Sequence, residues 1–80
     1  MEYIGIIEGI LYVVGDEGIS FEQLQDILEI EDSKLNEVLD ILKKTYENEV
    51  RGFRLEFLGN KYKLTTKKEH AKYFEKLIEN

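Results

Sequence analysis

Carboxylates are the most abundant side chains in this sequence that could perform chemistry, as general acids or bases. The 80 residues include 17 Asp and Glu, one His and no Cys. A carboxyl group takes such a role where its surroundings raise its pKa or pair it as an acid–base couple, and no carboxylate here lies beside features that would do so. His70 follows Glu69 without a Ser or Cys nucleophile in a recognisable setting. We therefore expect no enzymatic activity and assign no catalytic residue.

The same residue counts argue against a bound cofactor. A chain without Cys forms neither a disulfide nor a thiolate zinc site, and a single His excludes a metal site with several His ligands. The six glycines are dispersed, so no glycine-rich loop is expected to cradle a phosphate. The sequence contains no run of 18 apolar residues, so we predict no membrane span. Its first charged residue is the acidic Glu2, whereas a signal peptide begins with basic residues. The sequence predicts a cytoplasmic protein with no metal, cofactor, small-molecule substrate or membrane partner.

Charge is distributed unevenly along the chain. The formal net charge is −6, but residues 1–40 contain eleven acidic side chains and one basic side chain, Lys34. Residues 41–80 contain ten basic and six acidic side chains. The first half would repel a phosphate backbone, whereas the second half could approach one weakly.

The basic candidates for binding lie in a predicted hairpin and just after it. Five residues could contact nucleic acid or an acidic partner weakly: Arg54, Lys61, Lys63, Lys67 and Lys68. Lysines on exposed strands also prevent edge-to-edge aggregation without binding anything, and this interpretation is favoured. A third interpretation pairs the basic region with an acidic partner, such as the first half of another copy.

Two consecutive helices are predicted in the middle of the chain. Ile19 lies alone between a turn and a helix cap, where a short extended piece is expected. A capping box, S-F-E-Q at residues 20–23, begins a short helix that ends near Glu29. Phe21, Leu24 and Leu28 share the inward face of this helix, joined by Ile27.

Asp32 or Ser33 can cap a longer helix that runs to about Asn48. Its apolar residues recur at helical spacing. They are Leu35, Val38, Leu39, Leu42 and Tyr46.

The period changes from 3.6 to 2 after the longer helix. Residues 52–58 and 61–65 alternate apolar and charged side chains, and Gly59-Asn60 between them is a two-residue hairpin signal. Thr66 and Glu69 match a second capping box at the start of a last helix. The apolar residues of that helix could dock on the body of the domain, or the helix could exchange between chains. They are Ala71, Phe74, Leu77 and Ile78.

A short helix, a turn, a longer helix and a hairpin make a winged helix-turn-helix. The predicted fold class is therefore α+β and mostly helical, with one such domain over residues 1–80. This fold first suggests a DNA-binding transcriptional regulator, which remains the alternative function. However, the residues that would lead the longer helix into the major groove are mostly acidic, and phosphate contacts supply most of the affinity for DNA. They are Glu31, Asp32, Lys34, Asn36, Glu37 and Asp40.

The first helix, predicted to end at Gly15, has more apolar surface than one core face needs. One stripe suffices for the core: Tyr3, Ile4, Ile7, Ile10, Leu11 and Val14. A helix that is apolar nearly all round is buried on more than one side, and a G-x-x-x-G spacing allows close helix approach. We therefore predict a homodimer interface on the remaining residues. They are Gly5, Ile6, Gly9, Tyr12 and Val13.

Three segments resemble the bacterial segregation and condensation protein B family. Residues 7–20 are similar to its opening IEALLF-x-x-GEPLS, residues 24–46 to its L-x-x-xL-x-I … V-x-x-xL-x-x-L-x-x-xY region, and residues 61–69 to its GYRL-x-T-[RK]-PE segment. The differences lie in turns: Gly18 and Lys68 replace prolines, and Asn60-Lys61 replaces a GG wing. The resemblance covers nearly the whole chain.

The resemblance implies a non-enzymatic scaffold subunit of a bacterial condensin-like complex, which acts in chromosome condensation and partition during cell division. Its partners would be a second copy, the kleisin segregation and condensation protein A, and through it the structural-maintenance-of-chromosomes ATPase. DNA contact would be at most weak and indirect, and the protein would be nucleoid-associated. The chain resembles the N-terminal of two winged helices, the part that largely forms the dimer in this family.

Overall fold

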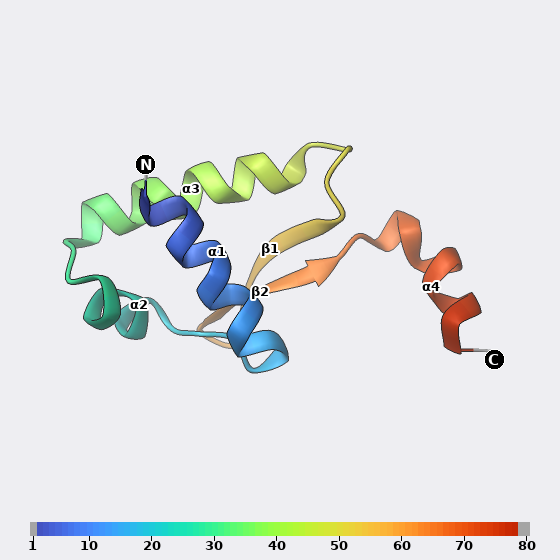
Figure 1. The fold of residues 1–80 in the computed structure, drawn as a ribbon, viewed down its shortest axis with the longest axis horizontal. Helices are drawn as coiled ribbons and strands as arrows, with labels where there is room; N and C mark the ends of the chain where they lie inside the picture. The colour runs from blue at the N-terminus through green and yellow to red at the C-terminus, as the bar shows by residue number, and fades with distance from the viewer. Residues whose placement is uncertain (1, 79–80) are drawn as a thin grey trace.

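The computed structural model describes residues 2–78, which form helices α1 to α4 and one hairpin in the predicted order (Figure 1). The α-helices are α1 (Glu2–Val14), α2 (Phe21–Leu28), α3 (Asp32–Glu47) and α4 (Ala71–Ile78). The strands β1 (Phe53–Leu58) and β2 (Lys61–Thr66) pair antiparallel. Two 3₁₀ turns, η1 (Gly15–Glu17) and η2 (Lys68–His70), complete the chain. Helices α2 and α3 with the hairpin after them form the predicted winged helix-turn-helix.

The connection from α1 to α2 adds a third extended segment to the hairpin. Gly15, at φ 57°, ends α1 as predicted. Ile19 is then extended and pairs with Tyr62 of β2 through two backbone hydrogen bonds, in which Ile19 N donates to Tyr62 O at 2.9 Å and Tyr62 N to Ile19 O at 2.7 Å. The predicted short extended piece is confirmed, and it attaches the first helix to the wing.

Helix α2 begins as predicted, whereas α3 does not. Ser20 Oγ accepts from Gln23 N at 3.1 Å, and Gln23 Oε1 accepts from Ser20 N at 3.0 Å, which completes the capping box. The predicted cap of α3 at Asp32 or Ser33 is wrong, because the extended Glu31 precedes the helix and Asp32 is already helical. The Asp32 carboxylate instead accepts a hydrogen bond from Gln25 Nε2 of α2.

The core lies where α1, α2, α3 and the hairpin meet. All five predicted apolar residues of α3 are buried, together with Ile7 and Leu11 of α1 and Leu24 of α2. Ile19 and Leu55 complete this cluster. Burying one such side chain stabilises a fold by about 1.5–3 kcal/mol. The core therefore holds the inner face of α1 and leaves its outer face available.

The hairpin turn has the geometry that its residues predict. Gly59 and Asn60 both have positive φ, 56° and 64°, as the two central residues of a type I′ turn require. Leu55 in the middle of β1 is buried, while Phe57 stays half exposed. The Phe57 ring contacts the Tyr62 ring across the strands in a tilted arrangement, with 4.6 Å between the ring centroids.

Helix α4 does not begin as predicted and does not dock on its own domain. The second capping box does not form, because Thr66 remains in the sheet opposite Phe53 and no side chain caps η2. Of the two alternatives left open for α4, docking on its own domain is not seen, because none of its residues is buried. Figure 1 shows α4 apart from the other helices, at one end of a molecule that measures 45 × 23 × 20 Å. The strand β2 and the turn η2 direct the chain away from the core.

Candidate functional site

The five residues predicted to form a dimer interface are all exposed on α1. Tyr12 and Val13 are 81% and 80% exposed, and Ile6 is 44% exposed. A Cβ atom added at Gly5 or Gly9 would meet nothing within 4 Å. Packing within this chain therefore does not require glycine at either position, although each costs helix stability of about 1 kcal/mol relative to Ala.

Three of these residues line an apolar groove between α1 and α2. The groove has a volume of about 500 Å³, and only apolar residues line it: Ile6, Gly9, Ile10, Val13, Val14, Ile19 and Ile27. Gly5 and Tyr12 do not belong to this lining. The structure thus divides the predicted set into groove residues and residues beside the groove.

Sequence reasoning missed four of the groove residues. Ile10 and Val14 belonged to the predicted core stripe of α1, and Ile19 to the extended piece. Ile27 was placed with the inward face of α2, but it is 55% exposed. Leu24 and Leu28 already fill the inner face of α2, so the sequence could have indicated that Ile27, at the edge of that face, points outward.

A part-buried hydrogen bond joins α1 to α3. The Tyr46 hydroxyl donates to the Glu8 carboxylate. Burial, together with the hydrogen bond to Glu8 and the negative charge of Glu8, raises the pKa of Tyr46 to about 12. Because Glu8 and Ile7 turn toward the core and α3, the opposite side of α1 with Gly9 and Val13 faces outward.

The segment that forms the groove is acidic in composition. Residues 2–28, which contain α1, η1 and α2, include six carboxylates and no Lys or Arg. An apolar groove within such a segment favours a partner with apolar and basic side chains.

The predicted basic contact surface is smaller than expected. Arg54, Lys61 and Lys68 are exposed and Lys63 is partly buried. Lys67 does not belong to this surface: it is 4% exposed, and its Nζ donates to the backbone oxygen of Asn48 at 2.6 Å. It therefore holds the end of β2 beside the end of α3.

A carboxylate lies within the remaining basic residues. Glu56 is opposite Lys63 in the hairpin and accepts a hydrogen bond from Thr65 Oγ1 at 2.6 Å. This hydrogen bond lowers the pKa of Glu56, and nearby cations such as Arg54 and Lys68 lower it further. Glu56 is therefore ionised at neutral pH, and its negative charge offsets part of the wing's positive charge.

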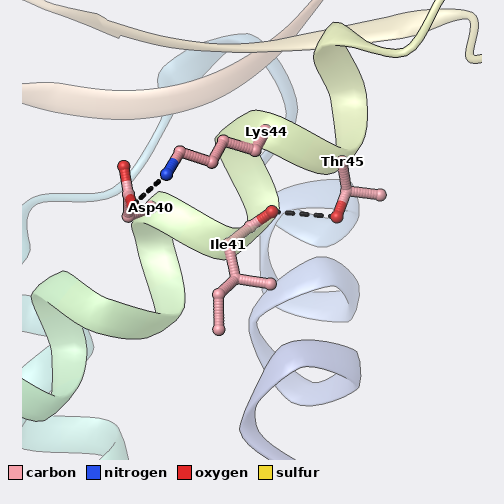
Figure 2. Close-up of polar contacts among 4 residues, drawn as sticks. All are labelled: Asp40, Ile41, Lys44 and Thr45. Carbon is pink, nitrogen blue, oxygen red and sulfur yellow. Dashed lines mark hydrogen bonds and ion pairs between the residues drawn. The ribbon is translucent and has the colours of Figure 1, made fainter.

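The outer face of α3 binds its own cations. Lys44 Nζ lies 3.2 Å from the Asp40 carboxylate, and Thr45 Oγ1 donates to the backbone oxygen of Ile41 at 2.8 Å (Figure 2). Lys34 lies 4.0 Å from the Glu37 carboxylate. Two of the three lysines of α3 thus lie beside carboxylates of the same helix, which does not favour insertion of α3 into a nucleic-acid groove.

Residues 2–78 offer neither a metal site nor a membrane-spanning helix. No group of three His, Cys, Asp or Glu side chains in this part of the chain is placed to hold a metal ion. No helix among the same residues is long and apolar enough to cross a membrane.

Comparison with known sequences gives consistent matches. A family model described as segregation and condensation complex subunit ScpB matches residues 5–80. Segregation and condensation protein B of Bacillus cereus (strain ATCC 10987 / NRS 248) is 46% identical over 74 residues, which are 92% of this chain. The protein of that name from Bacillus anthracis (strain CDC 684 / NRRL 3495) matches with the same identity and coverage. This chain spans 39% of the length of these curated relatives.

Solved structures share the fold. One is described as a crystal structure of a dimer of the ScpB N-terminal domain complexed with an ScpA peptide. It matches with a TM-score of 0.92 and 38% identity, over 95% of this chain and 94% of that chain. ScpB from Mycobacterium tuberculosis matches with a TM-score of 0.82 and 20% identity over 94% of this chain and 46% of that chain. The second match shows the fold alone.

Proposed function

Because the chain belongs to the segregation and condensation protein B family, we propose that it is a non-enzymatic scaffold subunit of a condensin-like complex and acts as a homodimer in chromosome condensation and partition. Its other partners are a kleisin of the segregation and condensation protein A type and, through it, the structural-maintenance-of-chromosomes ATPase. Residues 1–80 correspond to the N-terminal winged-helix domain. This proposal implies a cytoplasmic, nucleoid-associated protein.

The observation that supports this function is the apolar groove on α1. The groove lies on the face that the core leaves exposed, and contiguous apolar surface on a small domain marks an interface. A similar domain, at a TM-score of 0.92, is described as a dimer in complex with an ScpA peptide. We assign the dimer surface to Ile6, Gly9 and Val13, with Gly5 and Tyr12 at its border.

Two matched valines test the dimer surface. Val13 lies in the groove and Val50 lies in the turn after α3, and each is 80% exposed. Val13→Asp places a charge in the interface, so we expect it to raise the dimer dissociation constant at least about 30-fold. Val50→Asp should leave the dimer unchanged.

Sedimentation equilibrium measures both variants against the unmodified chain. Circular dichroism confirms that each variant is folded. A monomeric unmodified chain at tens of micromolar would refute the dimer. A Val13→Asp variant that dimerises as well as Val50→Asp would place the interface elsewhere.

A kleisin peptide provides a separate test of the assembly. We expect the folded domain to bind a fluorescent peptide from the cognate segregation and condensation protein A, and to increase its fluorescence anisotropy. A scrambled peptide of the same composition is the control. Equal anisotropy changes for the two peptides would contradict kleisin binding by this domain.

A further inference from the structure

Helix α4 has an apolar face that its own domain does not cover. Its apolar side chains occupy one half of the helix circumference: Ala71, Tyr73, Phe74, Leu77 and Ile78. Its polar side chains occupy the other half: Lys72, Glu75 and Lys76. Leu77 is 77% exposed and Ile78 is 84% exposed. A helix this short is marginal in water by itself, so its stability in solution requires a surface on which to pack.

The groove between α1 and α2 matches this face in length and chemistry. Along α1 it extends from Ile6 to Val14, which corresponds to about 12 Å of helix. Helix α4 contains 8 residues, which give the same length at a rise of about 1.5 Å per residue. Gly9 lies within the groove wall without a side chain, so a second helix can approach α1 closely there.

The groove and α4 of one chain cannot meet in this fold. Figure 1 shows α2 and α4 at opposite ends of the long axis, with α1 and the hairpin between them. Thr66 pairs with Phe53 at the end of the hairpin, and the buried Lys67 is bonded to Asn48 directly before η2. These contacts fix the direction in which α4 leaves the domain. An α4 helix in the groove must therefore come from another chain.

Charge also favours this pairing. The elements around the groove contain six carboxylates and no Lys or Arg between residues 2 and 28. Helix α4 carries two lysines, Lys72 and Lys76, and one carboxylate, Glu75, on its polar half, which is therefore net basic. A helix seated in the groove would bring these ammonium groups to an acidic border, which gives complementary potentials across the contact.

We propose that α4 of a second copy occupies the groove, so that each chain inserts its last helix between α1 and α2 of the other. The exchange is reciprocal and two-fold, since both chains offer the same groove and the same helix. This inference rests on the dimer proposed above and identifies the segment of the partner that covers α1.

Engineered cysteines test directly whether α4 of one chain lies in the groove of the other, because the natural chain contains no Cys. Chains with Ile27→Cys and chains with Leu77→Cys are mixed and oxidised, so that a bond between positions 27 and 77 joins two chains. The control replaces Ile27→Cys with Val50→Cys, another exposed residue outside the groove. We expect a covalent dimer in the first mixture at least about 10-fold more abundant than in the control.

A substitution in α4 gives an independent measurement. Leu77→Asp should not unfold the domain, because no residue of α4 is buried. We expect it to raise the dimer dissociation constant at least about 30-fold. The exposed Glu75→Gln on the polar side of α4 is the control and should change it less than about 3-fold.

The outcomes separate this inference from the proposed function. Suppose that the chain sediments as a dimer but the mixture with cysteines at positions 27 and 77 gives no more covalent dimer than the control. This result would overturn the binding of α4 in the groove and leave the proposed dimer intact. The same conclusion follows if Leu77→Asp dimerises normally. A chain that is monomeric at tens of micromolar would overturn both.

Discussion

Gly18 is the position at which one added methyl group should affect this fold most. Its φ of 71° and ψ of −175° lie in a region that only glycine adopts readily, at a cost to other residues of about 1–3 kcal/mol. A Cβ atom there would also lie 2.8 Å from the backbone oxygen of Tyr62 and 3.1 Å from the Cβ atom of Lys61. Tyr62 O cannot move aside freely, because it accepts the hydrogen bond from Ile19 N.

Gly18→Ala should therefore introduce backbone strain and also lose part of the Ile19–Tyr62 pairing. A lost hydrogen bond adds about 1 kcal/mol to the strain, so we expect the free energy of unfolding to fall by about 2–4 kcal/mol in total. Gly15→Ala is the matched control, since Gly15 also has positive φ, 57°, but nothing lies within 4 Å of its added Cβ. It should cost about 1–2 kcal/mol.

Urea denaturation followed by circular dichroism measures both changes at one chain concentration, which is held fixed because dimerisation adds to apparent stability. Amide hydrogen exchange reports the mechanism, and Ile19 and Tyr62 should exchange faster in Gly18→Ala than in Gly15→Ala. Equal losses of stability in the two variants would refute the close approach as the cause. Unchanged exchange at both amides would refute the loss of the pairing.

Three further predictions concern the core contact, the groove and the wing. Tyr46→Phe should lower the free energy of unfolding by about 1 kcal/mol near pH 7. Folding raises the pKa of Tyr46 from 10 to about 12, so the stability that its protonated hydroxyl provides is complete below pH 10 and is lost toward pH 12. The melting temperatures of the unmodified chain and the variant should therefore converge over that range. Gly9→Ala should stabilise the monomer by up to about 1 kcal/mol but weaken the dimer, and a stronger dimer in sedimentation would contradict the groove assignment. The double variant Lys61→Glu with Lys63→Glu should behave like the unmodified chain in gel shifts with duplex DNA at about 150 mM salt, because we expect neither protein to form a specific complex. A DNA shift by the unmodified chain that the double variant abolishes would favour the alternative function, a DNA-binding transcriptional regulator.

The fold could be predicted where the buried residues of an element recur at a regular spacing in the sequence. Helix α3 shows this, since its five apolar residues at helical spacing are the five that are buried. The capping box at Ser20 and the turn at Gly59-Asn60 were also predictable, because each depends on neighbouring residues alone. Local patterns of this kind determine an element without reference to the rest of the chain.

Helix α4 shows what such patterns cannot determine. Its amphipathic sequence indicates that one face needs cover, but it does not specify which surface covers it. Thr66 matched a capping box, yet its pairing with Phe53 kept it in the sheet. Here a tertiary contact overrode a local preference.

The candidate site was partly predictable for a related reason. The sequence predicts Ile6, Gly9 and Val13 as interface residues because α1 has more apolar surface than its own core requires, and the structure places all three in one groove. Ile19 and Ile27 join them from segments that are separate in the sequence, and only the folded chain places them together. Surplus apolar residues on one helix can be counted in the sequence. A groove between two helices can be predicted only when the relative position of the helices is known.

The pairing of Ile19 with Tyr62 has a consequence for the order of folding. The hairpin and the α2–α3 pair close short loops, but this bridge joins residues more than half the chain length apart. Closing a loop of several tens of residues costs roughly 3 kcal/mol of chain entropy. We expect the bridge to form after the rate-limiting step, so weakening it at Gly18 should accelerate unfolding and leave the refolding rate nearly unchanged. The segment that joins the first helix to the wing would then control how long the native domain persists.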